Sequence, residues 1–151
     1  MRAVVQRVSR AEVMIAGETV GAIGRGFMVL VCAMRGDTES EADLMAAKIG
    51  KLRVFRDADG RMNLAIGDVG GAVLAISQFT LAADTSRGNR PGFSTAAEPE
   101  TGARLYDHFC TRLRDEGLMV ETGRFGAEMA VSLVNDGPVT IMLDTETWRK
   151  G

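Results

Sequence analysis

Short apolar stretches separated by glycines occupy the first third of the chain. Residues 3–8 (AVVQRV), 11–17 (AEVMIAG), 18–24 (ETVGAIG) and 26–34 (GFMVLVCAM) are rich in valine, isoleucine and other apolar residues. Runs of this length between glycine turns are typical of β-strands, and their close spacing favours antiparallel pairing. The sequence therefore predicts four short strands before residue 35.

Two later segments have the apolar period of amphipathic helices. In residues 37–52, Thr38 and Glu41 have the spacing of a capping box, and Met45, Ile49 and Leu52 fall on one helical face. A second helix is expected to begin near Pro99 and to end at Gly117. Its apolar stripe consists of Leu105, Tyr106, Phe109 and Leu113.

The remaining segments alternate between strands and turns. Residues 54–63 (VFRDADGRMN) predict a strand, a turn and the start of another strand, and residues 71–81 (GAVLAISQFTL) predict a buried strand. Residues 82–98 form a long loop of a kind that is often functional. Residues 129–145 predict a strand pair around NDGPVT. We expect an α/β fold of mostly antiparallel sheets, or a barrel-like sandwich, covered by two amphipathic helices.

Composition narrows the class of protein. With 46% hydrophobic and 25% charged residues and no linker or repeat, residues 1–151 are expected to form one globular domain. No apolar run approaches the roughly 20 residues of a membrane span, and the start of the chain lacks a signal-peptide pattern. Cys32 and Cys110 lie in apolar segments and are expected to be buried thiols, which suits a cytoplasmic protein. We therefore expect no membrane partner.

The charge and the missing residue types restrict the chemistry. A net charge of −2 argues against broad binding of DNA or RNA, although it leaves room for a local grip on one RNA end. The only histidine, His108, lies in the second predicted helix and poorly supports a catalytic triad. One histidine and two scattered cysteines do not make a closed zinc site. We expect no metal and no cofactor, and catalysis by hydroxyls, amides, main chain or substrate.

The motif SQFTL closes the most apolar predicted strand. Alternation places Gln78 and Thr80 on the face of Leu74 and Ile76, so this face changes from apolar to polar within two residues. That change suits the rim of a pocket, and it equally suits a strand that becomes exposed at its end.

The motif NDGPVT, residues 135–140, has two interpretations. Asn-Asp-Gly is typical of a hairpin turn, but Pro138 removes a ladder donor directly after the glycine. In a trans form the motif is an ordinary hairpin. In a cis form the Gly137 and Pro138 carbonyls would point the same way and suit an ammonium group. Arg7, charged within an apolar strand, has either a buried partner or a solvated edge position.

Four segments together carry a family resemblance. The stretches SQFTLAADTSRGNRPGF, TGRFGAEMAVSLVNDGPVT, AVVQRVSRAEV and VFRDADGRMNL resemble the D-aminoacyl-tRNA deacylases, from Met1 to about Leu143. Only the tail DTETWRKG lies outside the resemblance, and the role of its Trp148 stays open. The resemblance implies a three-layer β/β/α fold and a cytoplasmic homodimer with active sites at the subunit interface. The implied substrate is the acceptor end of tRNA carrying a D-amino acid, or glycine mischarged onto tRNA(Ala), and the implied reaction is hydrolysis of its ester.

The resemblance also implies roles for single residues. Gly137 and Pro138 would form a cis pair that enters the partner's active site, holds the substrate α-amino group and excludes L side chains. Arg7 and Met129 would fix this loop. The residues that would line the site for the adenosine and the ester are Ser77, Gln78, Phe79 and Thr80.

Two questions of mechanism and two rival functions follow. Thr80 is the obvious nucleophile, but no histidine stands near it in sequence. We prefer attack by water assisted by the substrate 2′-hydroxyl, with main-chain N–H groups around 78–80 stabilising the oxyanion. Arg87 and Arg90 in the long loop are candidates for phosphate contacts. The rivals are a non-catalytic module that binds tRNA ends and a hydrolase of other D-amino-acid esters or amides.

Overall fold

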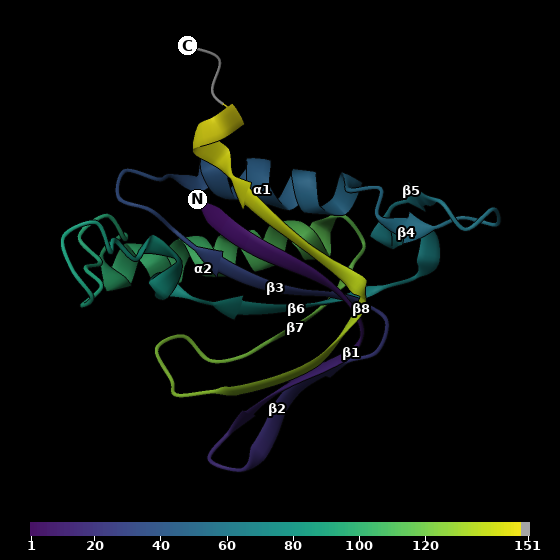
Figure 1. Ribbon diagram of the computed structural model, residues 1–151, viewed down its shortest axis with the longest axis horizontal. Helices are drawn as coiled ribbons and strands as arrows, with labels where there is room; N and C mark the ends of the chain where they lie inside the picture. Colours follow the sequence, from purple (N-terminus) through teal and green to yellow (C-terminus); the bar gives the residue numbers. More distant parts are fainter. Residues whose placement is uncertain (149–151) are drawn as a thin grey trace.

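One bent, six-stranded sheet forms the centre of the computed structural model, which describes residues 1–148 (Figure 1). The strand order is β2-β1-β3-β6-β7, and β8 pairs with β1 along most of its length. Pairs that include β1 are antiparallel, whereas β3–β6 and β6–β7 are parallel. The strands are β1 (Arg2–Ile15), β2 (Glu18–Ile23), β3 (Gly26–Cys32), β6 (Ala72–Ser77), β7 (Met119–Thr122) and β8 (Ala130–Asp144).

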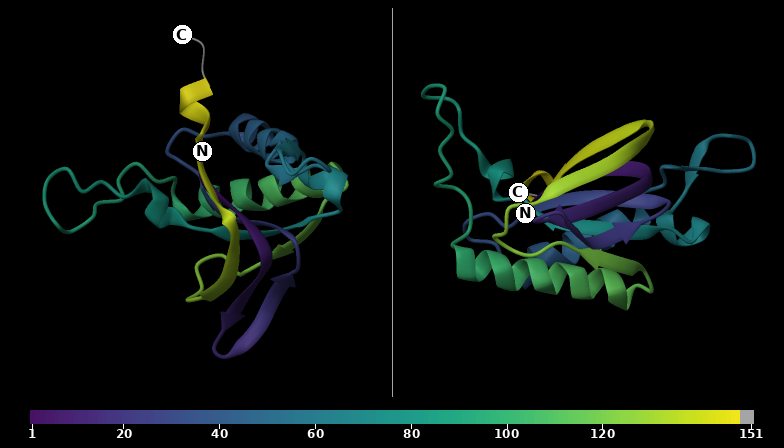
Figure 2. Two further views of the ribbon diagram at one scale, coloured as in Figure 1. Left: turned by 45° about the vertical axis from the view of Figure 1, so that its right-hand side comes forward. Right: turned by 90° about the horizontal axis from the view of Figure 1, so that it is seen from below.

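Both predicted helices are present and lie side by side on one face of the sheet (Figure 2). The capping box of α1 (Glu39–Lys51) is confirmed, because the Thr38 hydroxyl accepts from Ser40 N–H and the Glu41 carboxylate accepts from Thr38 N–H. α2 (Pro99–Asp115) begins at its proline and is followed by Gly117, at φ +87°. Neither of these helices, nor any other in the described chain, has the length and apolarity needed to span a bilayer.

The smaller elements are a hairpin and three single-turn helices. The predicted turn after Arg56 is confirmed and joins β4 to β5, and the hairpin extends from one end of the molecule (Figure 1). The bounds are β4 (Phe55–Arg56), β5 (Met62–Leu64), η1 (Ile66–Val69), η2 (Phe79–Ala82) and η3 (Thr145–Trp148). Trp148 packs against the core beside α1, with the Lys48 ammonium 5.1 Å from its ring centroid. Residues 149–151 of the predicted tail lie outside the described residues.

The core has two parts, and each part fills the space between two neighbouring layers of a three-layer fold. The larger part fills the space between the helices and the sheet, where Phe27, Phe55 and Phe109 are fully buried. The smaller part lies inside the bend of the sheet and contains Val8, Val13, Ile23, Met28, Leu74 and Ile76. β1 makes the bend because its first half pairs with β3 and its second half with β2. The predicted fold, sheets covered by one helical layer, is confirmed.

Three predicted strand boundaries are wrong. Residues 2–15 form one continuous strand rather than two, since β1 keeps its pairing with β8 through two register shifts. β6 ends at Ser77, and the next residues turn into η2 instead of continuing the alternation to Thr80. The strand pair expected around NDGPVT is a single strand, β8, in which the motif forms a bulge.

The α-amino group of Met1 is buried where three segments meet. Its nitrogen lies 2.7 Å from the Asp37 carboxylate and donates to the Thr145 hydroxyl at 2.8 Å. Met34 N–H donates to the same Asp37 oxygen, and Thr145 N–H donates to the Met1 carbonyl. The exposed fractions at the ion pair are 1% and 6%. A paired charge at this depth joins the start of β1 to the segment after β3 and to η3.

Replacing Asp37 with alanine is expected to lower the free energy of unfolding by about 3–5 kcal/mol, because a buried ammonium loses its counter-charge. The thermal midpoint should fall by roughly 6–20 °C. Asp59→Ala, which changes an exposed turn carboxylate, is the matched control and should stay within about 0.5 kcal/mol of the original protein. Equal midpoints for both variants would show that the buried pair contributes no stability.

Candidate functional site

A cavity of about 640 Å³ lies at the ends of β3 and β6. That volume lies in the usual range for a small-molecule site. β3 and β6 are parallel, so their carboxyl ends open at the same edge of the sheet. The start of α2 and the segments 93–97 and 125–129 close the other sides. The lining includes Cys32, Ser77, Gln78, Phe79, Phe93, Glu98, Tyr106, Phe125 and Met129.

The chain turns sharply at SQFTL, directly after the last hydrogen bond between β6 and β3. Gln78 N–H donates to the Val31 carbonyl at 2.8 Å, and η2 begins with the next residue. Phe79 and Thr80 occupy its first two positions, where N–H groups have no acceptor inside a helix. The Phe79 ring is 59% exposed and packs edge-on against Phe93, with centroids 5.0 Å apart. An aromatic surface at the cavity therefore lies next to two main-chain donors at the start of η2.

Thr80 lies at the edge of this cavity rather than in its lining. Its side chain is exposed, and its hydroxyl accepts a short hydrogen bond from the Gln78 amide. An amide donor cannot remove the hydroxyl proton, so this contact orients Thr80 without activating it as a nucleophile.

Two titratable groups of the cavity, the Cys32 thiol and the Tyr106 hydroxyl, are favoured in their neutral forms by burial. Burial raises the pKa of the Cys32 thiol above its ordinary value. Burial also raises the pKa of Tyr106, whose hydroxyl donates to the Ala75 carbonyl at 2.5 Å. The lining contains no histidine, and Glu98 at its edge pairs with Arg35 at 3.9 Å. Among residues 1–148, no group of three histidine, cysteine or acidic side chains is arranged to hold a metal ion.

The motif NDGPVT forms a bulge in β8 opposite Arg7. Val8 pairs with Asn135 and Gln6 pairs with Thr140, so residues 136–139 face Arg7 alone. The Gly137–Pro138 bond is cis, and Gly137 has φ +130°. Asn135 closes the bulge, because its side-chain carbonyl accepts from Val139 N–H at 3.1 Å and its amide donates to the Thr140 hydroxyl.

Arg7 fills the space beneath the bulge and is only 2% exposed. Its Nε donates to the Asp136 carbonyl at 3.1 Å and lies 3.4 Å from the Asp136 carboxylate. Its Nη1 donates to the Val54 carbonyl at 2.5 Å. Of the two positions left open by the sequence, the buried one with partners is correct.

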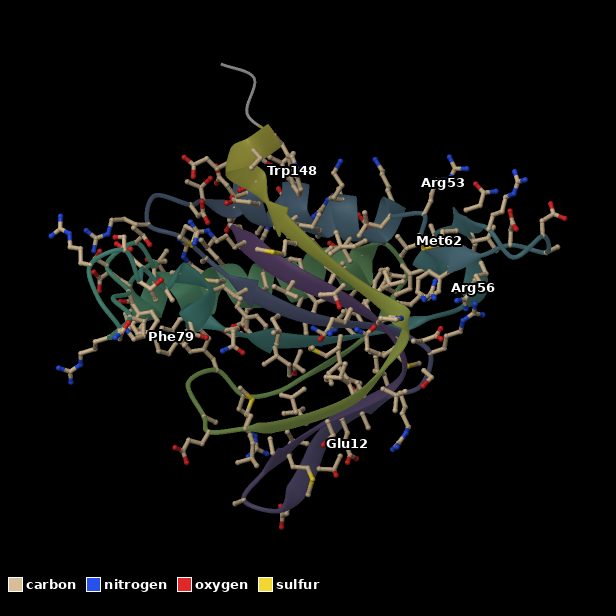
Figure 3. The ribbon with its side chains drawn as sticks, viewed as in Figure 1. Glu12, Arg53, Arg56, Met62, Phe79 and Trp148 are labelled. Atoms are coloured by element: carbon tan, nitrogen blue, oxygen red, sulfur yellow. The ribbon has the colours of Figure 1, made fainter. Side chains whose placement is uncertain are left out.

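The cavity and the bulge lie at opposite ends of the molecule. Figure 3 places Phe79 at one end and Arg53 and Arg56 at the other. The bulge lies at the second end, because Arg7 binds both the bulge and the Val54 carbonyl. Val54 lies between Arg53 and Arg56 in the sequence. Neither Gly137 nor Pro138 contributes to the cavity lining. The residues of SQFTL thus lie at the cavity and those of NDGPVT lie in the bulge, so one chain does not bring the two motifs together.

The other predicted residues are distributed between these places. Met129 lies in the cavity wall beside Gly123. Arg87 and Arg90 are exposed in the loop between Asp84 and Gly92, whose main chains pair. His108 lies between the helices with its Nε2 2.7 Å from the Asp43 carboxylate and takes no part in the cavity.

Several lining residues were not predicted as site residues. Phe93 follows Arg90 in the loop, and Phe125 precedes β8 within the quoted segment TGRFGAEM. Tyr106 was assigned only to the core stripe of α2, although it also forms the cavity wall. Phe93 and Phe125 each lie next to a glycine in a loop, and this pattern could have identified both as candidate site residues.

Comparisons with known proteins identify the family of this chain. The sequence model of the family described as D-Tyr-tRNA(Tyr) deacylase matches residues 4–144. A relative from Paracoccus denitrificans named D-aminoacyl-tRNA deacylase is 62% identical over 145 residues, which is 96% of this chain and 97% of that protein. A relative from Dinoroseobacter shibae with the same name is 60% identical over 144 residues, 95% of this chain and 99% of that one.

Solved structures share the fold. The structure of a c-Myc DNA unwinding element binding protein is similar, with a TM-score of 0.90, 42% identity and coverage of 95% of this chain and 98% of that one. A probable eukaryotic D-amino acid tRNA deacylase has a TM-score of 0.77 at 19% identity, covering 94% and 97%, and supports the fold alone. The resemblance seen in the two motifs is confirmed, and the chain belongs to the family of D-aminoacyl-tRNA deacylases.

Proposed function

We propose that this protein proofreads tRNA by hydrolysing the ester between a D-amino acid, or glycine mischarged onto tRNA(Ala), and the terminal adenosine. Membership of the family makes the chain a hydrolase of D-aminoacyl-tRNA. The observation that carries the finer proposal is the bulge at residues 136–139, which Arg7 fixes at the end of the molecule opposite the cavity.

A homodimer brings the two halves of the site together. The cavity has the aromatic surface and lies beside the main-chain donors, and the Gly137–Pro138 pair does not line the cavity of its own chain. A second copy, placed by a two-fold axis, would insert its bulge into the first cavity and receive the first bulge in its own. Met129 in the cavity wall would then support the bulge of the other copy.

Rejection of L-amino acids in this dimer is steric. The Gly137 and Pro138 carbonyls would accept hydrogen bonds from the substrate ammonium and thereby fix the α-carbon. An L side chain would then meet main chain, whereas a D side chain would point toward solvent. Such a site excludes one hand without recognising any particular side chain, and glycine, which has no side chain, is accepted.

Hydrolysis in this site uses main chain and substrate rather than a catalytic triad. The Phe79 ring would hold the adenine, and the N–H groups of Phe79 and Thr80 would stabilise the oxyanion. Gln78 N–H is not available for this, because it is bound to Val31. The lining contains no histidine to activate a hydroxyl, so the substrate 2′-hydroxyl would assist attack by water. Ser77 would contribute to the floor, and Thr80 would position neighbouring groups.

Purified protein is expected to hydrolyse D-tyrosyl-tRNA rapidly and to leave L-tyrosyl-tRNA intact, and Thr80→Ala should retain D-ester hydrolysis within a few-fold. The reason is that Thr80 accepts a bond from Gln78 and faces no base. Release of labelled tyrosine from the matched D and L esters measures both. A loss of 10³-fold or more in the variant would identify Thr80 as the nucleophile, and turnover of neither ester would favour a module that only binds tRNA ends.

Replacing Gly137 with alanine is expected to lower the rate on the D ester and to reduce the ratio of D to L hydrolysis by about tenfold or more. The added Cβ would lie 2.8 Å from Arg7 Nη2 and 2.9 Å from Val139 Cγ2, at a φ that side chains rarely adopt. Gly24→Ala is the matched control, since its Cβ meets nothing within 4 Å. Unchanged selectivity in the Gly137→Ala enzyme would show that the bulge does not take part in chiral selection.

Arg87→Ala is expected to weaken tRNA binding and to reduce the slope of log Kd against log salt by about 1, because one phosphate contact is lost. Arg87 and Arg90 are exposed beside the cavity, in the loop that carries Phe93. Filter binding of tRNA at several salt concentrations measures the slope. An unchanged slope would leave Arg87 as a solvated loop residue without a phosphate.

A further inference from the structure

Four exposed arginines gather at the end of the molecule that carries the bulge. They come from the β2–β3 turn and from the β4–β5 hairpin, and none of them forms an ion pair with a carboxylate in residues 1–148. The Asp57 carboxylate of this hairpin is occupied by the N–H groups of Asp59 and Arg61. The four are Arg25, Arg53, Arg56 and Arg61.

Two of these arginines are coupled to the bulge by a short series of contacts. Arg7 binds the Asp136 carbonyl of the bulge and the Val54 carbonyl. The residue after Val54, Phe55, lies under the Arg25 guanidinium at 5.5 Å from its ring centroid, and Arg56 follows directly. Figure 3 draws Arg56 at the same end as the bend of β8. These contacts therefore link the segments that carry Arg25 and Arg56 to the bulge with Gly137 and Pro138.

We propose that Arg25 and Arg56 of one copy bind backbone phosphates of the tRNA whose aminoacyl end occupies the cavity of the other copy. The inference rests on the proposed dimer. Where the bulge of a second copy enters the cavity, its two arginines arrive at the cavity rim. Their own cavity, at the far end of their own chain, is out of reach. The aminoacyl end of the tRNA would thus lie in the cavity of one copy, and the 3′ strand of the tRNA would contact both copies.

The chemistry of these two groups suits phosphate. Guanidinium groups donate paired, charge-assisted hydrogen bonds that match the geometry of phosphate oxygens. Arg53 differs, because its Nε and Nη2 are already bound to Asn63. In a chain of net charge −2, unpaired arginines beside the site give attraction at one place without general affinity for nucleic acid.

The test compares two substrates with the same ester, D-tyrosyl-tRNA and D-tyrosyl-adenosine, of which only the first carries phosphates. For Arg25→Gln/Arg56→Gln, kcat/KM on the tRNA should fall roughly tenfold at physiological salt, and hydrolysis of the adenosine ester should stay within twofold. The dependence of log KM on log salt for the tRNA should lose about 1.4 from its slope, the value for two single-strand phosphates.

Arg112→Gln is the matched control, because it removes one charge per chain from the outer face of the helical layer, where Arg112 pairs with Asp43 at 3.2 Å. Arg112→Gln should leave the hydrolysis of both substrates unchanged. A thermal midpoint for each variant separates loss of the Arg25–Phe55 contact from loss of phosphate binding.

Three outcomes contradict the inference or its basis. Equal losses on both substrates would mean that the arginines only support the bulge. Unchanged tRNA kinetics with unchanged salt slope would show that the phosphates lie elsewhere. Failure of the original protein to hydrolyse D-tyrosyl-adenosine and D-tyrosyl-tRNA alike would overturn the proposed function itself, independently of the arginines.

Discussion

The buried guanidinium of Arg7 is the interaction on which the two-part site depends. An ionised side chain that is 2% exposed costs several kcal/mol unless hydrogen bonds and an opposite charge compensate it. Arg7 obtains both from segments distant in sequence, the Asp136 carbonyl and carboxylate in β8 and the Val54 carbonyl before β4. Satisfying one charge therefore holds the bulge and the β4–β5 hairpin in a fixed relation to β1. A four-residue bulge without such a partner would be free to adopt many conformations.

This constraint explains how a simple fold can place acceptors and donors at separate ends. The cavity end has N–H groups at the start of η2 and the aromatic pair Phe79 and Phe93, while the bulge end has two carbonyls on a rigid support. A substrate ammonium needs acceptors and an ester oxyanion needs donors, so a complete site needs both ends. In the proposed two-fold dimer each cavity would receive one bulge, and the two sites would be equivalent. Selectivity by exclusion would then follow from main chain alone.

The features that the sequence predicted correctly depend on local signals. The capping box at Thr38 and Glu41, the stripe of α2 and the turn after Arg56 all arise within a few residues, and each is confirmed. The motifs SQFTL and NDGPVT identified the family because both are long and intact. What they do chemically was predictable only in part, since Phe93, Tyr106 and Phe125 reach the cavity through tertiary packing.

The wrong predictions have one physical origin. Asn-Asp-Gly-Pro carries every local sign of a hairpin, but β8 continues because residues on both sides of the bulge pair with β1 over its whole length. Likewise β6 ends at Ser77 and the chain turns into η2, which periodicity cannot reveal.

The net charge of the chain does not reveal where its charged side chains are paired and where they are not. Carboxylates of the helical layer are matched by cations, as in Glu39 with Arg104 and Asp43 with Arg112, whereas the arginines beside the bulge are left unpaired. The net charge of −2 therefore coexists with a locally cationic end. Long-range attraction to nucleic acid is weak in such a molecule, and short contacts near the site decide what binds. A protein that must release each tRNA after one hydrolysis benefits from that balance, because few phosphate contacts permit fast dissociation.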